Sequence, residues 1–144
     1  MKNIKMSFSL SYGIISSALL IVFMIPAAQA RDLNGEEVRA LFSDKTIFSY
    51  HEKKEFDIIS FYAADGSLKM SRRDETLPGM WRIDSKGSMC ITLKDPYSGV
   101  PKKERCRVIT EDNGKYQKYK VKNNGVRTLI ISYKKFVPGN PEGL

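Results

Sequence analysis

Hydrophobic and polar positions change their spacing near residue 46. Before it, the apolar side chains of Val38, Leu41 and Phe42 recur at helical spacing behind Asn34, a residue type that caps helices. After it, apolar positions fall in short runs rich in β-branched and aromatic residues, which is typical of strands. The pattern predicts a helix at about 35–43 and about eight strands, at 46–50, 57–63, 68–73, 79–84, 88–94, 103–110, 115–122 and 126–136.

Tight turns are predicted between several of these runs. The dipeptides Asp65-Gly66, Lys86-Gly87, Asn113-Gly114 and Asn124-Gly125 supply residues that accept the positive φ of hairpin turns. An eight-strand meander with one apolar face must close or fold into two sheets, because an open sheet exposes two hydrogen-bonding edges. We therefore expect a mainly β fold: a short N-terminal helix and then a small barrel or a barrel-like sandwich. Two prolines and two glycines after position 136 predict an extended tail from about 137.

The first 30 residues have the pattern of a secretory signal peptide. Two lysines begin it, an apolar stretch covers residues 13–26, and Ala28-Gln29-Ala30 is a small-x-small cleavage site. Cleavage would leave a single domain, residues 31–144, in the periplasm or outside the cell. An uncleaved anchor is the alternative, because residues 6–30 carry no charge and about 20 apolar residues can span a bilayer.

Composition and cysteine content fit an exported basic domain. The 144 residues include 24 Lys or Arg against 16 Asp or Glu, and 28% charged with 42% hydrophobic residues excludes collagen-like, coiled-coil and strongly disordered chains. Both cysteines, Cys90 and Cys106, lie after the leader, so an oxidising compartment predicts a disulfide. With a single histidine they make no four-ligand zinc site unless carboxylates join, and no haem motif is present, so we expect no metal and no cofactor.

The cysteines leave two alternatives for the inner face of the sheet. Residues bonded across neighbouring antiparallel strands point to the same face. Inward-pointing cysteines would leave Met89, Ile91 and Leu93 outside the core. Outward-pointing cysteines would bury those three side chains but turn Arg105 and Arg107 inward. A buried arginine is costly unless paired, so the second alternative predicts an internal ion pair or an anion-binding cavity, and a β-bulge would remove the conflict.

Several short motifs resemble the DUF995 family of small exported proteobacterial proteins. They are Asp44-Lys45-Thr46 after the helix, Phe61-Tyr62-Ala63-Ala64-Asp65-Gly66, Gly79-Met80-Trp81-Arg82-Ile83, Met89-Cys90-Ile91, Cys106-Arg107-Val108 and Gly139-Asn140-Pro141. The resemblance covers nearly all of the chain after the leader, although Asp44 stands where we expect glycine. The family has no known function, so the resemblance implies a Gram-negative periplasmic setting and a β fold, and no catalytic residue.

Residues 115–122 interleave cations with aromatic side chains, a combination that binds single-stranded nucleic acid. Export argues against nucleic acid. The period of a strand places Tyr119 and Val121 on one face and Tyr116, Lys118 and Lys120 on the other, so we expect a buried face and a solvated basic face. Outside the cytoplasm an anionic partner would be a small molecule, a lipid headgroup, an acidic glycan or an envelope protein.

Three function classes remain. The first is a non-enzymatic binding barrel, in which Tyr62, Trp81, Arg105, Arg107 and Tyr133 are candidate ligand-binding residues. The second is a periplasmic protein-interaction module, such as an inhibitor or an envelope-assembly factor, that presents the proline-bounded loop around Tyr97 to its partner. The third, a hydrolase, lacks a recognisable nucleophile elbow or acid–base pair, and we predict no catalytic residue.

Overall fold

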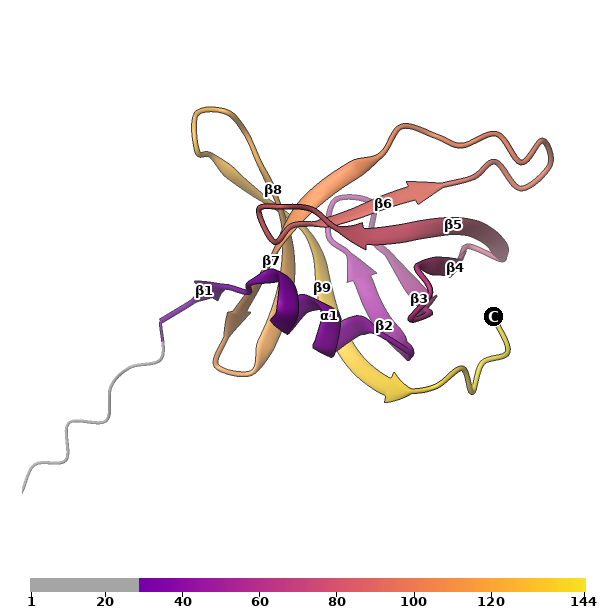
Figure 1. Ribbon diagram of the computed structural model, residues 1–144, viewed down its shortest axis with the longest axis horizontal. Coiled ribbons are helices and arrows are strands. Elements are labelled where there is room, and N and C mark those ends of the chain that lie inside the picture. Colours follow the sequence, from indigo (N-terminus) through magenta and orange to yellow (C-terminus); the bar gives the residue numbers. More distant parts are fainter. Residues whose placement is uncertain (1–28) are drawn as a thin grey trace, which may run out of the picture.

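The structure is a computed structural model, and it describes residues 29–144 (Figure 1). Its elements are β1 (Arg31–Asp32), α1 (Gly35–Phe42), β2 (Lys45–His51), β3 (Phe56–Tyr62), β4 (Ser67–Arg72), β5 (Glu75–Ile83), β6 (Met89–Leu93), β7 (Arg105–Asp112), β8 (Lys115–Val121) and β9 (Arg127–Pro138). The expected signal peptide and its alternative, a retained anchor, concern a segment that is almost wholly outside these residues. Within 29–144 no helix is long and apolar enough to cross a membrane.

Strands β2 to β9 form a closed antiparallel barrel. Each strand pairs with the next one in the chain, and β9 returns to pair with β2. The mainly β fold and the small barrel predicted from the sequence are confirmed. Closure gives each of the eight strands two neighbours, and the part of β7 beyond its pairing with β6 is covered by β1. The short β1 was not predicted, and it adds to β7 at residues 110 and 111.

The predicted helix and strands are confirmed, with shifted bounds at two prolines. Strand β5 begins at Glu75, four residues early. Pro78 is tolerated there because the pairing of β5 with β6 begins only at Gly79, so the missing N–H of Pro78 removes no hydrogen bond between these strands. Strand β9 runs on to Pro138, so the expectation that residue 137 begins an unpaired tail is wrong. Hydrogen bonds from the Thr46 hydroxyl and to the Asp44 carbonyl hold the backbone of Gly139 and keep this end of β9 beside β2.

Helix α1 plugs one end of the barrel. The Asn34 side chain accepts a hydrogen bond from the Glu37 N–H (3.0 Å), and the Glu37 carboxylate accepts one from the Asn34 N–H (2.8 Å). The buried ring of Phe42 makes edge contacts with Tyr62, Tyr133 and Phe136 at centroid distances of 5.1, 5.1 and 5.6 Å. This aromatic layer closes the α1 end. The opposite, distal end carries the β2–β3, β4–β5, β6–β7 and β8–β9 connections.

Candidate anion-binding site

The disulfide decides which face of β6 and β7 points into the barrel. Cys90 and Cys106 are bonded and stand directly opposite each other, with no register shift between their strands. Arg107 pairs with the fully buried Met89, and Arg105 pairs with Ile91, on the face that carries the core. The outward-pointing alternative is therefore the one that the structure adopts, and the bulge is wrong. Two arginines lie on the inner face of β7.

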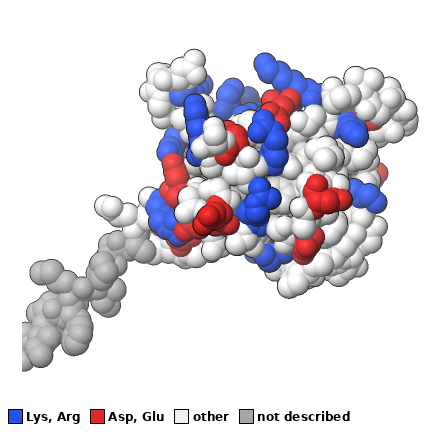
Figure 2. All heavy atoms as spheres, in the orientation of Figure 1, with Lys and Arg blue, Asp and Glu red and all other residues white. Residues whose placement is uncertain are grey.

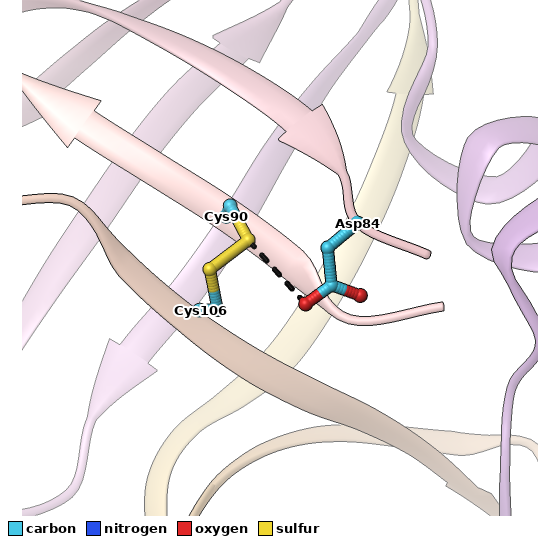
Figure 3. Close-up of side chains that lie close together, drawn as sticks. All are labelled: Asp84, Cys90 and Cys106. Carbon is cyan, nitrogen blue, oxygen red and sulfur yellow. Dashed lines mark hydrogen bonds between the residues drawn. A yellow bond between two sulfur atoms is a disulfide. The ribbon is translucent and has the colours of Figure 1, made fainter. Parts of the chain in front are cut away.

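A carboxylate lies beside the disulfide, on the outer side of the sheet (Figure 3). One oxygen of Asp84 is 3.8 Å from Cys90 Sγ, and its other oxygen accepts hydrogen bonds from the N–H groups of Lys86 and Ser88, at 2.9 and 2.8 Å. The three ligand-type atoms lie within 4.8 Å of one another. Disulfide sulfurs are not thiolates, however, so in the oxidised protein this group serves to close the β5–β6 turn.

Lys118 is buried in the barrel wall, and sequence reasoning missed it. Its side chain is 7% exposed, and in register it lies between Ile109 of β7 and Ile131 of β9. The expectation that Lys118 faces solvent while Val121 is buried is wrong, because Ile109 belongs to the core and a residue paired directly with it must share its face. Val121 lies three residues further along β8, on the opposite face from Lys118, and is exposed.

A signal for this burial is present in the sequence. Asn113 and Gly114 both have positive φ and form a two-residue turn. Counting outward from that turn pairs Lys118 with Ile109, as observed. The sequence thus places the apolar Ile109 directly opposite Lys118, and this pairing indicates that Lys118 shares the buried face of the hairpin.

In the described part of the chain the cations Lys118 and Arg107 have no counter-ion. Within residues 29–144 neither Lys118 nor Arg107 forms an ion pair, since the ion pairs found there all involve other residues. Among the described residues, Arg107 donates one hydrogen bond, to the backbone carbonyl of Cys106 at 2.7 Å. Burial, and then the nearby Arg107 guanidinium, lower the pKa of Lys118 to about 7. Burial, and then the charge of Arg105, lower the pKa of Arg107.

Tyr133 adds a buried donor to these cations. In the described part of the chain its hydroxyl is buried and has no hydrogen-bond partner. Lys118 Nζ is 5.8 Å from the centroid of its ring, and the buried Ser49 stands opposite Tyr133 on β2. Burial raises the pKa of Tyr133 well above its usual value, so the hydroxyl keeps its proton. Lys118, Arg107 and Tyr133 together are the inner cluster.

Of the other predicted site residues, Tyr62 lies near Tyr133 of the inner cluster, because both rings contact Phe42 at 5.1 Å. Trp81 and Tyr62 are buried in the apolar core with their rings 5.6 Å apart, and Trp81 Nε1 donates to the Ala63 carbonyl at 2.8 Å. Arg105 lies on the inner face but is exposed, toward the distal end. Tyr97 is 95% exposed in the β6–β7 hairpin. Of the predicted residues, Arg107 and Tyr133 each lie near Lys118: the Arg107 guanidinium acts on its ammonium, and the centroid of the Tyr133 ring lies 5.8 Å from it.

Comparisons of the chain with family models, with curated proteins and with solved structures find no match. The chemistry of the inner cluster must therefore be inferred from its own geometry. Within the described residues the two cations lack a counter-ion and the Tyr133 hydroxyl lacks a hydrogen-bond partner. All three groups can donate hydrogen bonds, so the complementary group is one with several acceptor oxygens and negative charge.

Proposed function

We propose that the protein is an exported, non-enzymatic β-barrel module that binds an oxyanion at Arg107, Lys118 and Tyr133. The observation that carries this proposal is the buried ammonium of Lys118 beside Arg107 without a counter-ion. A buried charge that lacks a partner reduces stability, and proteins retain one where it has a role. A carboxylate, phosphate or sulfate group would supply the missing charge and an acceptor for the Tyr133 hydroxyl.

The donor set suits such a group. The guanidinium of Arg107 presents a planar fork of donors, the ammonium of Lys118 is a compact charge, and the Tyr133 hydroxyl is a neutral donor. Arg107 is only half-buried, so an anion can reach it from solvent, and the exposed Arg105 beside it would attract anions toward the barrel. An eight-stranded barrel has room for side chains and at most one small ligand. The group that enters is therefore small, whatever it is attached to.

We place this activity in the periplasm or outside the cell. The pattern of residues 1–30 supports export, and the Cys90–Cys106 disulfide is typical of proteins from oxidising compartments. The proposed membership of the DUF995 family agrees with that location and adds no catalytic residue. The oxyanion would then belong to a small molecule, a lipid headgroup or a glycan of the envelope.

Native mass spectrometry of the protein, purified from the envelope of cells that express the full chain, tests the proposal. We expect the wild type to retain an anionic small molecule or to bind added phosphate, sulfate or acetate. Arg107→Met should stay folded and lose that binding, whereas the matched control Arg39→Met, at an exposed arginine of α1, should keep it.

Two outcomes would contradict the proposal. If Arg107→Met binds the anion as tightly as the wild type does, the inner cluster is not the site. If the wild type retains a stoichiometric protein and binds none of the anions, the protein is an interaction module, and the exposed Tyr97 becomes the residue to test.

A further inference from the structure

Charge is divided unequally between the two ends of the barrel. The four distal connections, residues 51–56, 72–75, 94–105 and 120–127, contain eleven Lys or Arg and six Asp or Glu. The segments at the α1 end contain five Lys or Arg and nine Asp or Glu; they are residues 31–45, 63–67, 84–88, 111–115 and 138–144. Figure 2 shows acidic side chains with basic ones beside them over the part of the surface that carries α1, and mainly basic ones along the edge from which the distal hairpins project.

The excess of basic over acidic residues at the distal end comes from two hairpins. Residues 94–105, between β6 and β7, and residues 120–127, between β8 and β9, together hold seven of the eleven cations and two of the six acids. We call them the paired hairpins. Figure 1 shows that they extend beyond the barrel on two separate sides of it. The distal connections at 51–56 and 72–75 each balance two cations with two acids.

The paired hairpins also carry most of the exposed large apolar side chains. Five such side chains are found in residues 29–144, and four of them are Tyr97, Val100, Val121 and Val126, with exposed fractions of 95, 59, 40 and 49%. The fifth, Met80, lies on β5. Single exposed apolar residues are ordinary, but their concentration on the two most basic hairpins is not explained by folding.

The acids of the paired hairpins are already engaged. Asp95 accepts hydrogen bonds from the N–H groups of Tyr97 and Ser98, at 3.1 and 3.0 Å, and so shapes the tip of its hairpin. Glu104 accepts two hydrogen bonds from Arg82, at 2.8 and 2.6 Å. Arg127 is the one hairpin cation that forms an ion pair within residues 29–144, with Asp32. Five hairpin lysines form no ion pair within residues 29–144: Lys94, Lys102, Lys103, Lys120 and Lys122.

We infer that the paired hairpins dock the protein on the surface of an anionic phospholipid membrane. Tyrosine and valine side chains can enter the headgroup boundary while lysines beside them contact lipid phosphates, and each lysine near such a surface strengthens binding roughly five-fold. A fluid membrane can receive two separate small tips at once. A protein partner is instead anchored by a contiguous buried cluster, which these separated residues do not provide. The acidic α1 end would face away from the lipid.

This docking shares no residue with the inner cluster, so either proposal can fail without the other. Sedimentation with vesicles of equal parts phosphatidylglycerol and phosphatidylcholine tests it, with vesicles of phosphatidylcholine alone for comparison. The N-terminus of the protein must first be established by mass spectrometry, because a retained leader would bind vesicles through its own apolar stretch.

We expect wild-type protein to sediment with the anionic vesicles and not with the neutral ones. Lys102→Gln combined with Lys122→Gln should lower the partition coefficient roughly 25-fold. Tyr97→Ser combined with Val126→Ser should lower it roughly ten-fold at the same salt concentration. The matched controls Lys86→Gln and Met80→Ser, at an exposed cation and an exposed apolar residue outside the paired hairpins, should bind as the wild type does.

Failure of the wild type to bind anionic vesicles would overturn the inference, as would equal binding to both kinds of vesicle. If the lysine variant loses binding while the Tyr97 and Val126 variant keeps it, the apolar tips do not enter lipid. The surface would then be a site for soluble polyanions, and the membrane inference would be wrong.

Discussion

Replacement of Lys118 by methionine should stabilise the empty barrel at neutral and acidic pH. Methionine has a similar length and keeps the apolar stem that packs between Ile109 and Ile131, but it removes the buried charge. Removing a buried charge that lacks a counter-ion relieves its desolvation and its repulsion from Arg107. The variant should thus fold more stably and lose the proposed anion binding.

The size of the effect follows from the pKa of Lys118, which falls to about 7 in the folded protein from an ordinary 10.5. Each unit of difference between the folded and unfolded pKa values corresponds to about 1.4 kcal/mol. The protonated side chain therefore lowers the free energy of unfolding by up to about 5 kcal/mol. Below pH 7 the folded and unfolded chains are both protonated at this site, and the full penalty applies. Between pH 7 and 10.5 the unfolded chain binds more protons, so wild-type stability rises with pH.

We therefore expect Lys118→Met to raise the free energy of unfolding by about 2 to 4 kcal/mol at pH 6, because imperfect packing of the new side chain offsets part of the gain. The gain should shrink to less than about 1 kcal/mol by pH 10. Urea unfolding followed by Trp81 fluorescence, with the disulfide intact and chloride as the only small anion, measures both values. Lys120→Met, at an exposed lysine of the same strand, is the control and should change little at either pH. A variant less stable than the wild type at pH 6, or a gain that is independent of pH, would refute the reasoning.

Three further predictions concern the core, the disulfide and the leader. Trp81→Ala should cost about 3 to 5 kcal/mol because the ring is buried, and an unchanged urea midpoint would show that it is not part of the core. Replacing Cys90 and Cys106 together by alanine should cost about 3 kcal/mol by loop closure; thiol titration of the denatured, unreduced wild type should find no free thiol, and two would disprove the bond. N-terminal sequencing of exported protein should begin at Arg31, whereas intact Met1 in the membrane fraction would identify an anchor.

The strand order could be predicted because its signals are local. The four glycine-containing dipeptides have the positive φ that hairpins need, and each joins strands that pair directly. Strand β1 could not be found in this way, since two residues carry no periodicity. The predicted strands 79–84 and 126–136 stop short of Pro78 and Pro138, which the structure includes in β5 and β9. Whether a proline breaks a strand depends on which side its missing N–H would face, and the sequence does not show that.

The interior of the barrel is harder to predict, because the alternation of side chains along a strand does not say which of its two faces points inward. Residues 116–121 place aromatic and basic side chains on both faces, so local pattern does not say which face is buried. The decision depends on partners across the sheet, namely Ile109 opposite Lys118 and Ser49 opposite Tyr133. The pairing of Cys90 with Cys106 is the one long-range constraint that the sequence supplies. It leaves two alternatives, and in the one that the structure adopts Arg107 points into the barrel.

The pKa of Lys118, measured by NMR from the chemical shift of its ε carbon, tests the central claim most directly. The signal is assigned by its absence in Lys118→Met, and the titration is run once with chloride as the only small anion and once with saturating phosphate, sulfate or acetate. We predict a midpoint near 7 in chloride and a clearly higher midpoint with the anion that binds, because a bound negative charge favours the protonated ammonium. A midpoint near 10.5 in chloride, or one that none of the anions changes, would contradict an unpaired interior cation that binds an oxyanion.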